Sequence, residues 1–198
     1  MEYFRRYASE NVDAEFQIVS EYKFFFEKED DHMSETESFN LSEDEIINKA
    51  IGYINELSPI SDLFIENIGV VSRNKMNADG SAGIPEMLEC EITVIPIING
   101  LPVYSQDMYL RIVFNSEGIT KASSNLPENL EDLNANVADM DYSEDILHEI
   151  KVANADSDVW PAYYLSENNE LIRIYVVDCL SDNSMKILRA DSGAEIEL

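Results

Sequence analysis

Apolar residues near the start of the chain fall on alternate positions, which is the two-residue period of a half-buried strand. The period predicts one long strand with these residues on one face: Phe16, Ile18, Tyr22, Phe24 and Phe26. Residues 27–40 are acidic, polar and aperiodic, so they bury too little apolar surface to offset the entropy lost on ordering. We therefore predict an N-terminal strand segment over residues 1–26 and an acidic linker over residues 27–40.

Residues 42–57 carry the strongest local signal in the chain, that of an amphipathic helix. Ser42 is placed as the N-cap, and Glu45 completes a capping box with it. Leu41 and Ile46 have the spacing of a hydrophobic staple. The apolar stripe at helical spacing, which we expect to pack on a sheet, consists of Ile46, Ile47, Ala50, Ile51, Ile54 and Leu57.

The segments after this helix are rich in β-branched and aromatic residues and are separated by Gly, Pro and Asn turn signals. They predict a meander of antiparallel strands over residues 63–73, 86–97, 103–114 and 118–123. Asn99 and Gly100 both tolerate the positive φ of a tight hairpin turn. Pro102 lacks an N–H and is expected to keep the strand end after the turn from pairing.

The second half of the chain repeats the order of a helix followed by strands. Residues 125–142 are acidic and Asn-rich without a period, and we place a boundary there. A weaker helix begins after Ser143, which can cap it. Strands are expected in residues 160–167, 170–180 and 184–190. This order predicts an α+β fold of two helix-plus-antiparallel-sheet units, over residues 41–126 and 127–198, preceded by the N-terminal strand.

The hairpin "NGLPVY" at 99–104, with the strand "MYLRIVF" and the return "NSEGITKAS", resembles the Asn-Gly-Ile-Pro-Val-Tyr hairpin of thermolysin-type peptidase prosegments and of PepSY domains. "YSEDILHEI", "ELIRIYVVD" and "KILRADSGAEIEL" are similar to the helix and closing strands of a PepSY unit. The closing motif departs from the family's Asp-Ala-x-Thr-Gly-Glu ending at Ser192 and by an inserted Ala194. The resemblance implies two PepSY-like units that act outside the cytoplasm. Such domains restrain a peptidase or modulate a membrane signalling protein, for example as the extracellular part of a bacterial regulatory lipoprotein.

The net charge of the chain limits the classes of partner that it is expected to bind. Lys and Arg number 13 against 40 Asp and Glu, for a net charge of −27, which repels nucleic acid and anionic membranes. We therefore expect no nucleic-acid binding and a protein partner of basic character. No segment reaches the roughly 20 apolar residues of a membrane span, so membrane anchoring would need a segment absent from this chain. The oligomeric state stays open, and so does a cytoplasmic location.

The residues that could carry chemistry do not form a recognisable catalytic set. His32 and His148 have no nucleophile motif near them, and Val152 stands where a zinc peptidase helix would need its second histidine. Cys90 and Cys179 lie in apolar runs and are expected to be buried free thiols. Residues 139–145, "DMDYSED", space oxygens like a calcium loop but lack its glycine and its final Glu. We predict no catalytic residue, no metal and no cofactor.

Aromatic residues on two predicted strands could line a groove for a polypeptide, although period-two aromatics are also typical of a core. The expected binding surface consists of Asn99, Gly100, Leu101, Pro102, Tyr104, Trp160 and Tyr163. The function predicted from the sequence is a non-enzymatic extracytoplasmic binding and regulatory module. A cytoplasmic acidic inhibitor or immunity-type protein, and an enzyme of unrecognised type, remain as alternatives.

Overall fold

A computed structural model describes residues 14–28, 38–77, 79–130, 133, 142–168, 170–179 and 184–196. The chain divides into two compact units. We call the first unit Met1–Ile95 with Tyr109–Leu126, and the second unit Pro96–Met108 with Pro127–Leu198. The chain changes unit between Leu126 and Pro127, and Pro96–Met108 belongs to the second unit instead of to the expected 41–126 segment.

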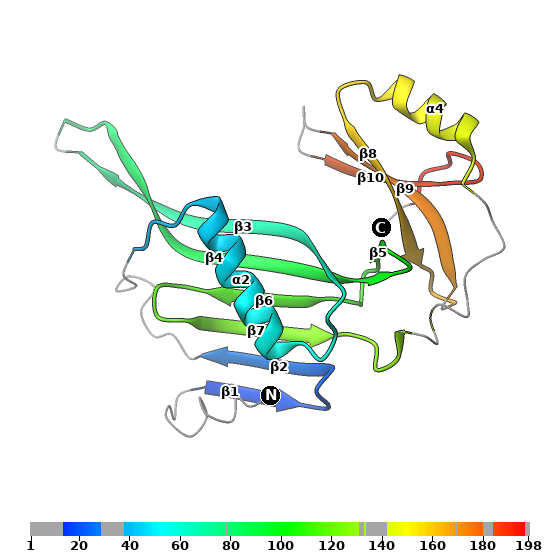
Figure 1. Cartoon of the computed structure of the whole chain (residues 1–198). Helices are drawn as coiled ribbons and strands as arrows, with labels where there is room; N and C mark the ends of the chain where they lie inside the picture. Colours follow the sequence, from blue (N-terminus) through cyan, green and yellow to red (C-terminus); the bar gives the residue numbers. More distant parts are fainter. Residues whose placement is uncertain are drawn as a thin grey trace. The chain divides into compact units, whose positions relative to one another are not determined.

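The first unit is a mainly antiparallel sheet. Its strand order is β1-β2-β7-β6-β4, and β3 also pairs with β4 (Figure 1). The strands are β1 (Ala14–Ile18), β2 (Lys23–Lys28), β3 (Leu63–Met76), β4 (Ala82–Ile98), β6 (Leu110–Phe114) and β7 (Ile119–Asn125).

The single N-terminal strand expected from the sequence is instead a hairpin of β1 and β2. The backbone amides of Val19 and Ser20 both donate to the carbonyl of Lys23 at 3.0 Å, which closes a turn between the strands. Ile18 pairs with Phe24 across this turn, and both positions are even-numbered. The alternation of apolar residues therefore continues unbroken through the reversal, and the period could not reveal it.

The ends of the expected linker belong to structured segments, whereas residues 29–37 lie outside the described residues. Glu27 and Lys28 are part of β2. Phe39 forms an isolated antiparallel bridge with Met87 of β4, and its amide donates to the Met87 carbonyl at 3.0 Å. Phe39 also packs against the core of the first unit. The apolar side chain of Phe39 thus ties the end of this segment to the sheet.

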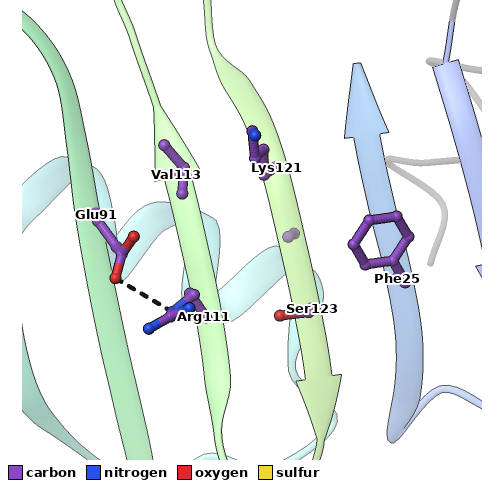
Figure 2. A pocket seen from close by; sticks show the side chains of 7 residues that line it. Phe25, Glu91, Arg111, Val113, Lys121 and Ser123 are labelled. Carbon is purple, nitrogen blue, oxygen red and sulfur yellow. Dashed lines mark ion pairs between the residues drawn. The ribbon is translucent and has the colours of Figure 1, made fainter. Parts of the chain in front are cut away.

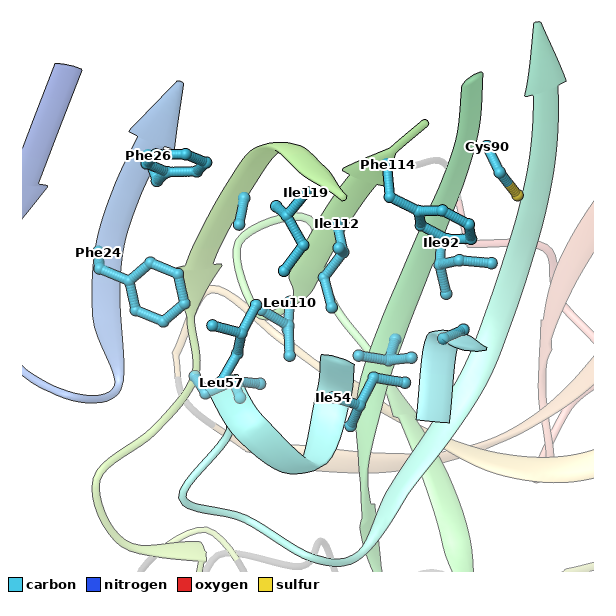
Figure 3. Packing of buried hydrophobic residues seen from close by; sticks show 14 of the residues in the cluster. Phe24, Phe26, Ile54, Leu57, Cys90, Ile92, Leu110, Ile112, Phe114 and Ile119 are labelled. Atoms are coloured by element: carbon cyan, nitrogen blue, oxygen red, sulfur yellow. The ribbon is translucent and has the colours of Figure 1, made fainter. Parts of the chain in front are cut away.

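Helix α2 (Glu43–Leu57) covers one face of this sheet, as the sequence predicts. The Ser42 hydroxyl accepts from the Glu45 amide, and the Glu45 carboxylate accepts from the Ser42 amide at 2.8 Å, so the capping box is confirmed. Figure 3 shows the helix residues Ile54 and Leu57 facing apolar side chains of the sheet. The buried core comprises Phe24, Phe26, Ile46, Ala50, Ile54, Leu57, Cys90, Ile92, Val94, Leu110, Ile112, Phe114, Ile119, Ala122 and Leu126.

The second unit contains a smaller sheet with the strand order β5-β8-β9-β10, and its described residues include helix α4 (Glu144–Ala153). The strands are β5 (Leu101–Tyr104), β8 (Asp158–Leu165), β9 (Leu171–Cys179) and β10 (Ser184–Arg189). Strands β5 and β8 are parallel, with Val103 opposite Tyr163, whereas the sequence predicted antiparallel pairing only. The strand predicted over 103–114 is likewise two strands, β5 and β6, one in each unit. Long-range pairing of this kind leaves no local signal in the chain.

Two tyrosines attach the start of α4 to its sheet. The Tyr142 hydroxyl donates to the Ala162 carbonyl at 2.8 Å, and the Tyr175 hydroxyl donates to the Ser143 carbonyl at 3.3 Å. Their ring centroids lie 5.5 Å apart. Burial, as the main cause, raises the pKa of Tyr142 well above its ordinary value, so the hydroxyl keeps the proton that it donates. Ser143 caps the helix, as predicted, by accepting from the Ile146 amide.

Gly52 in the middle of α2 offers a direct test of the helix assignment. A Cβ added at Gly52 would have no atom within 4 Å. Because alanine is favoured over glycine in helices, we expect Gly52→Ala to raise the free energy of unfolding by about 0.5–1 kcal/mol in urea denaturation. The comparison variant is Gly100→Ala, where φ is +79° and the same change should lower the stability by about 1 kcal/mol. A loss of stability in Gly52→Ala would contradict the helical environment described here.

Candidate protein-binding site

The hairpin at the centre of the sequence-based prediction is a tight turn between β4 and β5. Asn99 and Gly100 have φ values of 51° and 79°, and Ile98 pairs with Leu101 on either side of them. Positive φ at both central positions is the conformation that selects Asn-Gly in two-residue hairpins. The predicted turn is confirmed, and it has a structural reason of its own.

Pro102 does not prevent pairing at this strand end, contrary to the sequence-based expectation. Pro102 lies in β5 in register with Ile97. Opposite residues in an antiparallel pair alternate between hydrogen-bonded and non-hydrogen-bonded positions. The Ile98–Leu101 pair next to the turn takes the hydrogen-bonded position, so Pro102 takes the position at which β4 requires no N–H.

The structure brings the predicted aromatic residues into one sheet but buries most of their surface. Tyr104 is 3% exposed and Tyr163 is 5% exposed, and Tyr163 packs in an apolar cluster that Leu101 also contacts. Trp160 is half-buried, and its Nε1 is shielded from solvent without a hydrogen-bond partner among the described residues. Within the folded unit, the two tyrosines contribute to packing. Their role in binding stays a prediction.

The remaining candidate residues occupy ordinary positions. His148 is exposed on α4. Cys90 and Cys179 are buried free thiols, as predicted, and burial raises the pKa of the Cys90 thiol. His32 and residues 139–141 of the acidic run lie outside the described residues. Within the described part of the chain, no three His, Cys, Asp or Glu residues are grouped so as to hold a metal ion.

Several exposed apolar side chains of the first unit lie on the hairpin of β3 and β4. We call residues 69–87 the arm. Figure 1 shows the arm continuing beyond the part of the sheet that α2 covers. Its exposed apolar side chains are Val70 at 48%, Val71 at 44%, Met76 at 73% and Ile84 at 86%. Val70 and Val71 are consecutive in β3, so apolar groups are exposed on both faces of the arm.

Strand β3 is also an edge strand. Among the described strands it pairs only with β4, so its other edge presents backbone N–H and C=O groups that no described strand uses. Residues 67–72 of this edge read "NIGVVS", without a charge or a proline. Proteins usually protect an exposed edge with charged residues, proline or a bulge. The centre of β3 has neither charged residues nor proline.

The arm differs in charge from the rest of the chain. It contains Arg73 and Lys75 against Asp79 and Glu86, so its net charge is zero in a chain of net charge −27. An Arg73 terminal nitrogen lies 3.2 Å from a Glu86 carboxylate oxygen and ties β3 to β4. A polypeptide that approaches the arm therefore meets an apolar, locally neutral surface.

Comparison with known proteins shows a likeness in fold but none in sequence. No protein-family model matches the chain, and no curated protein matches it in sequence. None of the helices in the described residues is long and apolar enough to cross a membrane. Among solved structures, the chain is similar to the C-terminal domain of YpeB from Bacillus megaterium, with a TM-score of 0.57 and 12% sequence identity. The likeness covers 99% of this chain and 93% of that one, and at this identity it shows a common fold.

Proposed function

We propose that this protein is a non-catalytic regulatory module that binds another protein by accepting a strand of it on the edge of β3. The observation that carries the proposal is the uncharged edge of residues 67–72, where the apolar arm begins and Val70 and Val71 are exposed. The fold shared with the YpeB C-terminal domain supports a PepSY-type module, in agreement with the PepSY-like hairpin at 99–104. We extend this to two PepSY-like units, each with a helix on its sheet.

Strand addition would use both the edge backbone groups and the exposed apolar side chains of β3. The backbone groups of the edge would hydrogen-bond to the incoming strand, while side chains on alternate positions select its sequence. Val70 and Val71 lie on opposite faces and would each contact an apolar residue of that strand. Burying their exposed surface adds a hydrophobic contribution that is independent of charge.

The class of partner follows from the PepSY-like hairpin and from the charge. PepSY-like domains act outside the cytoplasm, so we propose an extracytoplasmic peptidase or membrane signalling protein as the partner, and anchoring of this protein as a lipoprotein. The acidic body would attract a partner of basic character. The same charge also favours the second candidate function, a cytoplasmic inhibitor of a basic protein. The cell fraction in which the partner is found separates the two.

Photo-crosslinking in the source cells tests the proposal. A photoreactive phenylalanine analogue is placed at position 71 in the arm or, as a control, at position 152 of α4, where Val152 is also exposed at 67%. The proposal expects a discrete crosslinked protein from position 71 and none from position 152. An envelope protein at position 71 supports the regulatory function, and a cytosolic one supports the inhibitor. Absence of a product at position 71 in both fractions contradicts binding at the arm.

Salt should slow the association of this protein with a basic partner. Long-range attraction between a body of charge −27 and a cationic surface raises the association rate, and salt screens it with a Debye length of about 10 Å at about 0.1 M. We expect the association rate constant to fall about tenfold or more when NaCl rises from about 0.05 to about 0.5 M, because screening increases over this range. The dissociation rate constant should change little. An association rate that does not depend on salt would argue against a basic partner.

A further inference from the structure

The face of the first sheet opposite α2 carries a second candidate site. Along β4 and β6 the residues buried beneath α2 alternate with polar residues on the other face, such as Glu91 and Arg111. The Arg111 and Lys121 side chains are 55% and 52% exposed. This face is thus accessible, and it presents two cations in a chain with only 13 Lys and Arg.

A hollow of about 280 Å³ lies on this face. Figure 2 shows Phe25 of β2 on one side of it and Arg111 of β6 on the other, with Ser123 of β7 between them. The register places Ser123 directly between Phe25 and Arg111, as its partner on each neighbouring strand. A small side chain between two large ones is what creates the space.

Arg111 has unused donors at this hollow. Its Nε lies 3.2 Å from a Glu91 carboxylate oxygen, and within the described part of the chain no partner is found for its two terminal nitrogens. Lys121 also lines the hollow, and its Nζ lies 2.6 Å from a Glu27 carboxylate oxygen. Of the charged residues that line the hollow, two are basic and one is acidic, and Glu27 beside Lys121 balances the second cation.

We propose that this hollow binds a carboxylate joined to an apolar group. The guanidinium of Arg111 matches the planar carboxylate with two parallel donors, and such charge-assisted pairs are among the strong hydrogen bonds. The Phe25 ring and Val113 contact the apolar part of the ligand. Because Glu91 and Glu27 already balance the charges of Arg111 and Lys121, a singly charged carboxylate is repelled less than doubly charged phosphate. This inference does not depend on the proposed strand addition at β3, because it concerns β2, β4, β6 and β7 and a ligand that is bound through its charge.

The carboxylate could belong to a free organic acid or to the C-terminus of a peptide, and both present the same chemistry. The probes are therefore 3-phenylpropionate and the peptide acetyl-Gly-Gly-Phe with a free carboxyl group. Each has a matched neutral control, 3-phenylpropionamide and the amidated peptide. The full chain is labelled with ¹⁵N, and the shifts of its amide signals are followed at constant pH and ionic strength.

We expect saturable shifts at Arg111, Lys121 and Ser123 with a dissociation constant on the order of millimolar for such small probes. The neutral controls should give shifts at least tenfold smaller. Binding of the acid and the peptide alike supports a general carboxylate site, and binding of the peptide alone assigns the site to a C-terminus. Equal shifts from acid and amide, or no shift from either acid, would overturn the proposal.

Three variants distinguish binding in the hollow from effects of substitutions elsewhere in the protein. Arg111→Gln should weaken binding at least tenfold. Ser123→Leu keeps the charge and fills the hollow, and it should abolish binding even if Arg111→Gln fails to fold. Arg189→Gln breaks a comparable ion pair, with Asp191 in the second unit, and should bind like the wild type. Binding within twofold of the wild type in folded Arg111→Gln or Ser123→Leu would contradict the assignment.

Discussion

Phe114→Ala is expected to lower the free energy of unfolding by about 3–5 kcal/mol, the usual cost of removing a fully buried ring. Phe114 is 0% exposed, and its ring centroid lies 5.4 Å from that of Tyr53 and 6.4 Å from that of Phe39. The Lys49 Nζ lies 5.3 Å from the same centroid, close enough for a cation–π interaction. One substitution thus removes contacts of the sheet with both α2 and the segment before it. Urea denaturation followed by circular dichroism measures the loss.

The control for this prediction is Ile84→Ala, which removes an apolar side chain that is 86% exposed. Exposed positions usually tolerate such changes within about 0.5 kcal/mol. Phe114→Leu should fall between the two, because it keeps part of the buried volume. A loss of less than about 1.5 kcal/mol in Phe114→Ala is far below the range for buried aromatic residues. Such a result would place Phe114 outside the core.

The double variant Val70→Lys, Val71→Lys is expected to weaken partner binding at least a hundredfold, which corresponds to about 2.8 kcal/mol at 1.4 kcal/mol per factor of ten. Lysine on an edge strand opposes the approach of another strand and removes the apolar contact. Both valines are about half exposed, so the stability of the free protein should change little. Surface plasmon resonance with the crosslinked partner measures the affinity.

Two further variants test whether binding is lost because the apolar side chains are removed or because positive charge is added. Val70→Glu, Val71→Glu makes the arm more attractive to a basic partner, yet it should also lose binding because the edge is no longer apolar. Val152→Lys adds a positive charge on α4, in the second unit, and should bind like the wild type. Affinity within threefold of the wild type in both double variants would exclude the valines from the interface.

Local signals in the sequence predicted the local structure well. The capping box of Ser42 and Glu45, the cap at Ser143 and the turn at Asn99-Gly100 are all confirmed, because each depends on residues a few positions apart. The reversal between β1 and β2 and the parallel pairing of β5 with β8 were missed. Both depend on which strands meet, and alternation along the chain does not contain that information.

The candidate sites show the same limit. Tyr104 and Tyr163 alternate with other residues as surface aromatics would, and only the packing of the second unit reveals that they are buried. The uncharged run "NIGVVS" is visible in the sequence, but its meaning depends on β3 being an edge strand. The hollow beside Arg111 arises from the register of β2, β7 and β6, whose residues are far apart in the chain.

Hydrogen exchange along β3 tests the central claim most directly. The amides of an edge strand point alternately toward its neighbour and away from it, so only every second amide of β3 gains a partner when a strand is added. We predict that binding slows exchange at least tenfold at alternate residues within 67–76, and that exchange at residues 99–104 and in α4 stays as in the free protein. Slowed exchange at residues 99–104 or in α4, with β3 unchanged, would contradict strand addition at this edge.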